Sequence, residues 1–202
     1  MTSRKLWISS DVRRAGDAAE ILKEFARETG ISGKDEQHLN LLTEETLGMA
    51  GSKLKDFEGE ILLQETPEGY RILLEADVRE PEAGERTEML PAEGFMAKVA
   101  EMLNCSYVFE SAADAPESIA EMLPDYFSYG VRGDRSDPAW AGNWSLTDYR
   151  EHLRQVLKGN PEAAVEMDEL EKSIVARLAD EVTIGILGRK VRLVIEKKVK
   201  KT

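Results

Sequence analysis

Hydrophobic and polar positions predict a strand and two helices at the start of the chain. Residues 4–9 read as a short strand, and from about 14 to 29 apolar side chains recur at helical spacing. Gly30 follows that helix at the position where a left-handed residue commonly ends one. A second helix is predicted over about 33–52, opened by Ser32. One stripe of this second helix is predicted to face the core: Leu39, Leu42, Thr46 and Met49.

A β-hairpin follows. Residues 60–65 and 70–77 are apolar runs, and the segment Thr66-Pro67-Glu68-Gly69 between them is typical of a turn. Residues 78–93 carry many charges and no usable period, so they predict a long loop, of a kind that is often functional. A helix over about 94–104 and a strand over 105–110 are predicted next.

The second half of the chain predicts more helices and a closing hairpin. A helix is expected over 115–127, and the stretch 128–144, rich in Gly, Pro and aromatic residues, is expected to be a loop. Ser145 is expected to cap a helix that runs to about Leu157. Pro161 is expected to start a longer helix that ends at Ala179. Its inward side chains are predicted to be Met167, Leu170, Ile174 and Leu178.

Taken together, these elements predict an α+β fold, a two-layer sandwich in which helices cover one face of a mostly antiparallel sheet. We expect a single domain over 1–202, with a helical segment at 111–180 inserted before the closing hairpin at 181–199. Trp140, Trp144 and Tyr149 cluster near the 128–144 loop. A small satellite core is the favoured interpretation of this cluster, and a ligand platform is the alternative.

Charge and composition argue against a nucleic-acid-binding protein, a Cys/His zinc protein and a membrane-spanning protein. The chain has 202 residues, a net charge of −12, one cysteine and two histidines. Such an acidic body repels phosphates, and one cysteine with two histidines cannot build a Cys/His zinc site. The apolar stretch near the N-terminus is too short for a signal peptide or a membrane span. These features predict a soluble, reduced, cytoplasmic protein.

The basic residues are concentrated at one end of the chain. Residues 181–202 hold seven basic side chains and two acidic ones. Two interpretations are open: the basic end binds an anionic partner, or it folds against acidic neighbours of the same chain. The second interpretation is favoured.

One side of the helix at 33–52 is a candidate site. At about 100° per residue, Glu44, Gly48 and Leu41 lie together on roughly the opposite side from the core stripe. A carboxylate one turn before a glycine is compatible with a pocket that a ligand enters closely. The alternative is a solvated surface on which Glu44 and Glu45 are ordinary helix formers.

The stretch from Ala18 through Met49 resembles the start of the GHKL ATPase domains, and it is closest in cadence to the anti-sigma-factor serine kinases of bacteria. In that family a helix and a short glycine-containing turn precede a second helix that carries the N-box. The resemblance places Glu44 at the general-base position. It places Gly48 where the family has an asparagine that ligates magnesium. It implies a Bergerat-like fold for about residues 4–110, plus the closing strands.

The later motifs of the family are incomplete. The resemblance makes Asp77 the candidate for the adenine-binding aspartate, but no glycine follows at the +2 or +4 position. Gly94 matches the second glycine box, which lacks its glycine pair, and Lys98 is a further candidate nucleotide contact on the same predicted helix. Since Gly48 supplies no side-chain oxygen, the magnesium that neutralises a triphosphate loses a ligand.

These departures predict a degenerate, regulatory, protein-binding module that binds ATP or ADP weakly, with Mg²⁺ as the accompanying ion. By resemblance its partner is a sigma factor or an anti-anti-sigma-like regulator, with no nucleic acid and no membrane involved. Two alternatives remain. One is an active ATP-dependent serine kinase with Glu44 as general base. The other is a purely structural interaction protein whose pocket is filled by its own side chains.

Overall fold

The computed structural model describes residues 1–10, 15–54, 56–78, 96, 99, 142–156, 160–187 and 190–199. Several predicted elements lie outside these residues. They are the strand at 105–110, the helix at 115–127, most of the loops at 78–93 and 128–144, and the helix at 94–104 except for Met96 and Val99, which are helical.

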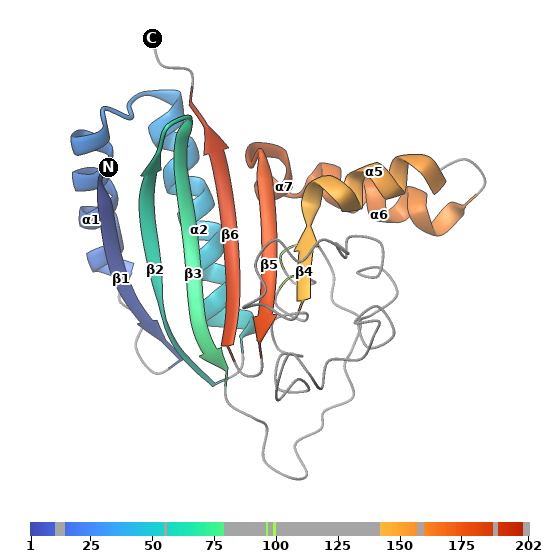
Figure 1. Ribbon diagram of the computed structural model, residues 1–202, viewed down its shortest axis with the longest axis horizontal. Coiled ribbons are helices and arrows are strands. Elements are labelled where there is room, and N and C mark those ends of the chain that lie inside the picture. The colour runs from blue at the N-terminus through green and yellow to red at the C-terminus, as the bar shows by residue number, and fades with distance from the viewer. Residues whose placement is uncertain are drawn as a thin grey trace.

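The described strands form one six-stranded sheet in the order β1-β2-β3-β6-β5-β4 (Figure 1). Every pair of neighbouring strands is antiparallel. The predicted hairpin joins β2 and β3, and the predicted closing hairpin joins β5 and β6 and places β6 beside β3. The strands are β1 (Ser3–Ser9), β2 (Phe57–Thr66), β3 (Gly69–Val78), β4 (Gly142–Ser145), β5 (Glu181–Leu187) and β6 (Lys190–Lys198).

Helices α1 (Ala15–Thr29) and α2 (Lys34–Lys53) lie on one face of this sheet, behind the strands in Figure 1. Helices α5 (Leu146–Val156) and α6 (Pro161–Lys172) pack on each other beyond the β4 edge of the sheet. The short helix α7 (Ile174–Leu178) returns the chain to β5 and packs against α2. The predicted α+β class with helices covering one sheet face is confirmed.

The core lies between the sheet and α1–α2. Alternate residues of the strands point into it, as the two-residue period of a strand requires. The predicted inward stripe of α2 is confirmed, since its four side chains are almost completely buried. Thr46 is accommodated there because its hydroxyl donates to the Leu42 carbonyl oxygen at 2.8 Å.

The connection between α1 and α2 depends on two glycines. Gly30 has φ 73°, so the predicted left-handed end of α1 is confirmed. The predicted cap at Ser32 is wrong. The residue that precedes α2 is Gly33, with φ 61° and no side-chain hydrogen bond to the helix. Because Gly33 occupies the capping position, the exposed Ser32 lies one residue too far toward the N-terminus to cap α2.

Two predictions in the second half need correction. Residues 142–144 are not loop, because they begin β4, which pairs with β5 at the edge of the sheet. The single helix predicted from Pro161 to Ala179 is broken at Ser173, whose extended backbone ends α6 and whose hydroxyl accepts from the Ala176 N–H at 3.2 Å. Because of this break, Ile174 is 42% exposed instead of inward.

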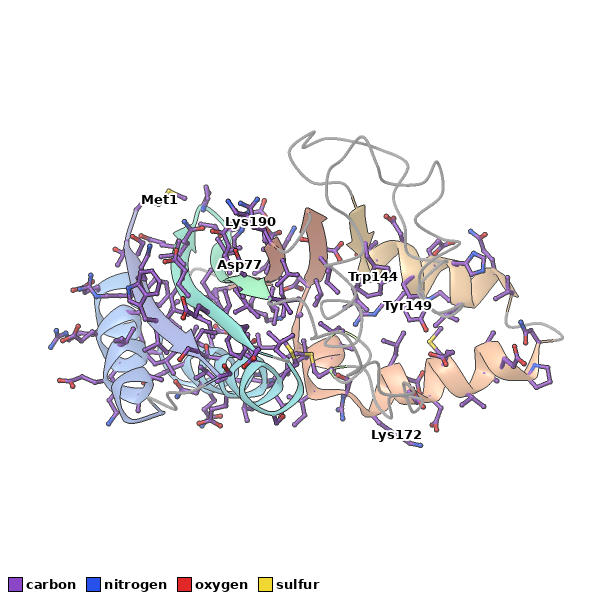
Figure 2. The ribbon with its side chains drawn as sticks, turned by 90° about the horizontal axis from the view of Figure 1, so that it is seen from below. Met1, Asp77, Trp144, Tyr149, Lys172 and Lys190 are labelled. Atoms are coloured by element: carbon purple, nitrogen blue, oxygen red, sulfur yellow. The ribbon has the colours of Figure 1, made fainter. Side chains whose placement is uncertain are left out.

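The pairing of the basic end is supported, and two of the three clustered aromatic residues are buried. Trp144 and Tyr149, labelled in Figure 2, have ring centroids 5.5 Å apart and belong to the main hydrophobic core and not to a separate satellite. Trp140 lies outside the described residues. Lys197 contacts Asp180 at 3.1 Å, and Lys198 contacts Glu68 at 2.8 Å. These basic side chains of β6 therefore face acidic partners of the same chain. Within the described residues, no helix combines the length and apolar composition that crossing a membrane requires.

Candidate functional site: a cavity between α1 and α2

A cavity of about 490 Å³ opens between α1, α2 and the adjacent ends of β1 and β2. This volume falls in the range of small-molecule sites in proteins. The lining residues come from four elements, β1, α1, α2 and β2: Ile8, Ser9, Ala18, Ala19, Leu22, Lys23, Glu36, Asn40, Glu44, Leu47, Gly48, Ala50, Gly51, Ser52 and Phe57.

The inner wall of the cavity is apolar. Leu22 of α1 and Phe57 of β2 are buried core side chains that reach it, and Ile8 of β1 and Leu47 of α2 are packed against the core beside them. The helical period brings Ala18 and Leu22 to the same side of α1. The walls therefore belong to the rigid frame of the sheet and its two covering helices.

The rim is polar, and most of it comes from α2. Glu36, Asn40 and Glu44 follow one another at intervals of four residues, which places them along one side of the helix. Lys23 contributes an ammonium group from α1. The cavity thus combines an apolar interior with two carboxylates, one amide and one ammonium group at its edge.

Two glycines leave open space on the α2 side of the cavity. A Cβ atom at Gly48 or at Gly51 would meet no other described atom within 4 Å. Helix interiors disfavour glycine by about 1 kcal/mol relative to alanine, and neither position has a tight contact that demands it. What the two glycines do provide is open space at the mouth of the cavity.

Four charged or amide side chains of the rim have no protein partner in the described part of the chain. No hydrogen bond or ion pair there involves the side chain of Lys23, Glu36, Asn40 or Glu44, whereas the Ser52 hydroxyl donates to the Gly48 carbonyl oxygen. Some acidic side chains elsewhere are paired, as Glu60 is with Lys5 at 2.7 Å and Glu196 is with Arg71. The polar side chains at the cavity mouth are not tied up in this way by the described residues.

The predicted site residues are only partly brought together. Glu44 and Gly48 line the same cavity. Leu41, grouped with them by the wheel, is 39% exposed and is not a lining residue. Gly94 and Lys98 lie outside the described residues.

Asp77 lies on the other face of the sheet. It sits near the end of β3, opposite Glu58 and Lys190 (Figure 2). Its neighbours Ala76 and Val78 are buried in the core under the helices, so the alternation of the strand directs the Asp77 side chain away from α2. The structure does not place Asp77 with Glu44, and a nucleotide contact by Asp77 stays a prediction.

Sequence reasoning missed several lining residues. Glu36 and Asn40 could have been found from the sequence, because they share the helical side of Glu44 at intervals of four residues. Lys23 and Leu22 on α1 had none, since their approach to α2 depends on how the two helices pack on the sheet. The apolar depth of the cavity was likewise not visible in the sequence of α2 alone.

Metal binding and acid–base chemistry have few candidates in the described residues. No group of three or more His, Cys, Asp or Glu side chains lies close enough there to hold a metal ion. Among the described acidic groups, the pKa that is most strongly shifted belongs to Tyr70, which lies away from the cavity. Burial raises the pKa of this phenol, and nearby Asp35 and Asp180 add to the effect. The size of the cavity suits a small molecule, and the Glu44 carboxylate at its rim is a hydrogen-bond acceptor.

Comparisons with known proteins add no assignment. The chain matches no protein-family model, and no curated protein or solved structure is similar to it at a significant level.

Proposed function

We propose that this chain is a regulatory, protein-binding module related to the GHKL ATPases, with at most weak affinity for ATP or ADP and no phosphotransfer activity. One observation carries the proposal. Glu44 lines a cavity as a general base would, and the residue one turn later, where the family has its magnesium ligand, is a glycine that lines the same cavity.

The order of the elements supports the relation to that family. The resemblance implies a helix, a glycine-containing turn and an N-box helix followed by a hairpin. The described chain has α1, the Gly30–Gly33 turn, α2 and then β2–β3 in the same order. The closing hairpin β5–β6 completes the same sheet beside β3. This agreement concerns the order of elements and not the motifs.

The chemistry of the positions argues against phosphotransfer. A transferred phosphoryl group needs its negative charge neutralised, chiefly by Mg²⁺ and by cationic side chains. Gly48 offers the ion no oxygen, and Asp77 lies on the other face of the sheet from Glu44. Among the described rim groups, two carboxylates and a single ammonium also repel a triphosphate more than they attract one.

The nucleotide part of the proposal is tested by a restoring substitution. Gly48→Asn returns an amide oxygen to the magnesium position, and open space around the Cβ position accommodates it. Gly51→Asn is the matched control, because it adds the same side chain three residues away on the same cavity. We expect no Mg²⁺-dependent ATP turnover by the wild-type chain. A rise in Mg²⁺-dependent nucleotide affinity is expected for Gly48→Asn alone.

The opposite result would support the serine-kinase alternative. Magnesium-dependent turnover by the wild-type chain that Glu44→Gln abolishes would overturn the proposal and assign Glu44 as a general base. Turnover that survives Glu44→Gln would contradict both the proposed absence of phosphotransfer and the alternative in which Glu44 is the general base.

The protein-binding part rests on the resemblance, which names a sigma factor or an anti-anti-sigma-like regulator as the partner class. It is tested by mixing the purified full chain with purified sigma factors and regulators of its own cell and measuring the mass of the complex in solution. A defined, saturable complex with one of them is expected. If none of them binds, the purely structural alternative replaces the regulatory module.

A further inference from the structure

The cavity between α1 and α2 has charged and amide side chains at its rim that no described residue pairs with. The side chains of Glu36, Asn40 and Glu44 on α2 and of Lys23 on α1 make no hydrogen bond or ion pair in the described part of the chain. Carboxylates that stand beside an apolar cavity and have no cation gain from one that a ligand supplies. The charges of these unpaired side chains therefore indicate the chemistry of the ligand.

The charges of the rim favour a cation. Two of the four polar rim groups named above are carboxylates and one is an ammonium, and the whole chain carries a net charge of −12. Among the described rim groups the carboxylates outnumber the ammonium, and the charge of the whole chain has the same sign, which attracts cationic ligands and disfavours polyphosphates. Asn40, between Glu36 and Glu44 on the helix, can accept a further hydrogen bond from a donor group.

The interior favours an apolar body. Leu22, Leu47, Ile8 and Phe57 present only hydrocarbon to the inner wall. A ligand that fills this wall removes its apolar surface from water, and a polar group placed there would have to give up its hydrogen bonds to water. The open space beside Gly48 and Gly51 lets a ligand approach the α2 backbone closely.

We infer that the cavity between α1 and α2 binds a small amine, with an apolar body against Leu22 and Phe57 and an ammonium group at Glu44 and Glu36. This inference goes beyond the proposed function and is independent of it. A regulatory module with no affinity for amines remains a regulatory module, and an amine site is compatible with any partner protein.

Three probes with closely similar apolar bodies separate the contributions. Phenylbutylamine and phenylbutanol carry a positive and a neutral head group on the same phenyl ring and four methylenes, and phenylbutyrate carries a negative head group on a chain that is one methylene shorter. Each is titrated into the full chain by calorimetry at low salt, where charge contributions are largest. We expect saturable binding in the order amine, alcohol, carboxylate, with the amine about fivefold tighter than the alcohol, as partly exposed ion pairs allow.

Variants locate the binding. The double substitution Glu36→Gln and Glu44→Gln is expected to lower the affinity for the amine to that for the alcohol and to leave the alcohol unchanged. Glu171→Gln, on the exposed surface of α6, removes a negative charge away from the cavity and is expected to change neither affinity. Gly48→Leu places a side chain in the open space at the mouth and is expected to abolish binding of all three probes.

Three results would overturn the inference. They are phenylbutyrate binding as tightly as phenylbutylamine, absence of saturable binding by every probe, and unchanged amine affinity in the double Glu→Gln variant. A folded Gly48→Leu variant that binds the amine as the wild type does would place the site elsewhere. The Mg²⁺-ATP measurements of the proposed function do not depend on any of these outcomes.

Discussion

Two regions of the molecule differ in how far their polar side chains are paired within the chain. In the α5–α6 region, the Tyr149 hydroxyl donates to Glu166 at 2.7 Å, Ser145 bonds the Glu181 carboxylate, and the Arg150 guanidinium donates to the Ala176 carbonyl oxygen. At the α1–α2 cavity, the rim carboxylates have no partner in the described part of the chain.

The difference predicts different effects of substitution in the two regions. Polar groups that are satisfied internally fix the geometry of the α5–α6 hairpin and of its attachment to the sheet. Polar groups that stay unsatisfied beside a preformed apolar cavity contribute little to stability and remain available to a ligand. Substitutions in the first region should therefore change the free energy of unfolding, and substitutions in the second should change binding.

The largest expected effect is at Trp144. Trp144→Ala removes a buried indole that packs on Tyr149, and should lower the free energy of unfolding by about 3–5 kcal/mol. Trp7→Ala is the control, because Trp7 is 65% exposed on β1 and its loss should cost within about 0.5 kcal/mol. Urea denaturation followed by circular dichroism measures both. Equal losses would contradict a structural role specific to the α5–α6 region.

A pair of tyrosines gives the next largest contrast. Tyr149→Phe removes a hydrogen bond to the Glu166 carboxylate and should cost about 1–2 kcal/mol. Tyr70→Phe should be neutral or slightly stabilising at neutral pH, because the buried Tyr70 hydroxyl has no hydrogen-bond partner among the described residues. Thermal denaturation of the two variants checks the contrast, and a costly Tyr70→Phe would show that its hydroxyl is bonded.

Tyr70 also predicts a dependence on alkaline pH. Burial raises the pKa of its phenol above the ordinary value of 10.0, so the unfolded chain loses this proton first. The contribution of Tyr70 to stability is therefore complete below about pH 10 and is lost as the pH rises further. The wild-type chain should lose more stability than Tyr70→Phe between about pH 9 and about pH 11. Parallel losses would contradict the raised pKa.

Two glycines at the α1–α2 side should respond with opposite signs. Gly48→Ala should stabilise the fold by about 1 kcal/mol, since Gly48 is helical and the Cβ meets no described atom. Gly30→Ala should destabilise it by about 1 kcal/mol, since φ is 73° there. Differential scanning calorimetry measures the two shifts. A destabilising Gly48→Ala would mean that the space at the cavity mouth is needed for folding.

The smallest expected effect on stability is at Glu44. Glu44→Gln should change the free energy of unfolding by less than about 0.5 kcal/mol, because no described residue pairs with this exposed carboxylate. Isothermal chemical denaturation provides the measurement. A clear loss of stability would assign Glu44 to the fold and would remove it from the candidate site.

Much of the fold could be predicted because local patterns carried it. The stripe of α2, the left-handed Gly30 and both hairpins follow from period and turn chemistry in short stretches. The break at Ser173 was missed because the apolar period continues across it, so that Ile174 keeps a core-like spacing and is nevertheless exposed. The strand β4 was missed because four residues in a Gly- and aromatic-rich stretch carry no strand period.

The candidate site could be predicted only from the α2 side. Glu44 and Gly48 were found on a helical wheel because they belong to one helix. Lys23, Leu22 and Ile8 reach the same cavity from other elements, and their approach is set by packing on the sheet. The separation of Asp77 from Glu44 could not be predicted either, because it depends on which face of the sheet each residue of β3 occupies. Alternation along β3 directs the Asp77 side chain to the face away from α2.

The proposed absence of phosphotransfer is tested most directly by calorimetric titration of the full chain with ATP and ADP, each with and without Mg²⁺, together with an assay of ATP turnover. The account predicts weak or undetectable binding that Mg²⁺ does not strengthen, no turnover, and the same behaviour in Glu44→Gln. Saturable binding that requires Mg²⁺, accompanied by turnover that Glu44→Gln abolishes, would contradict it.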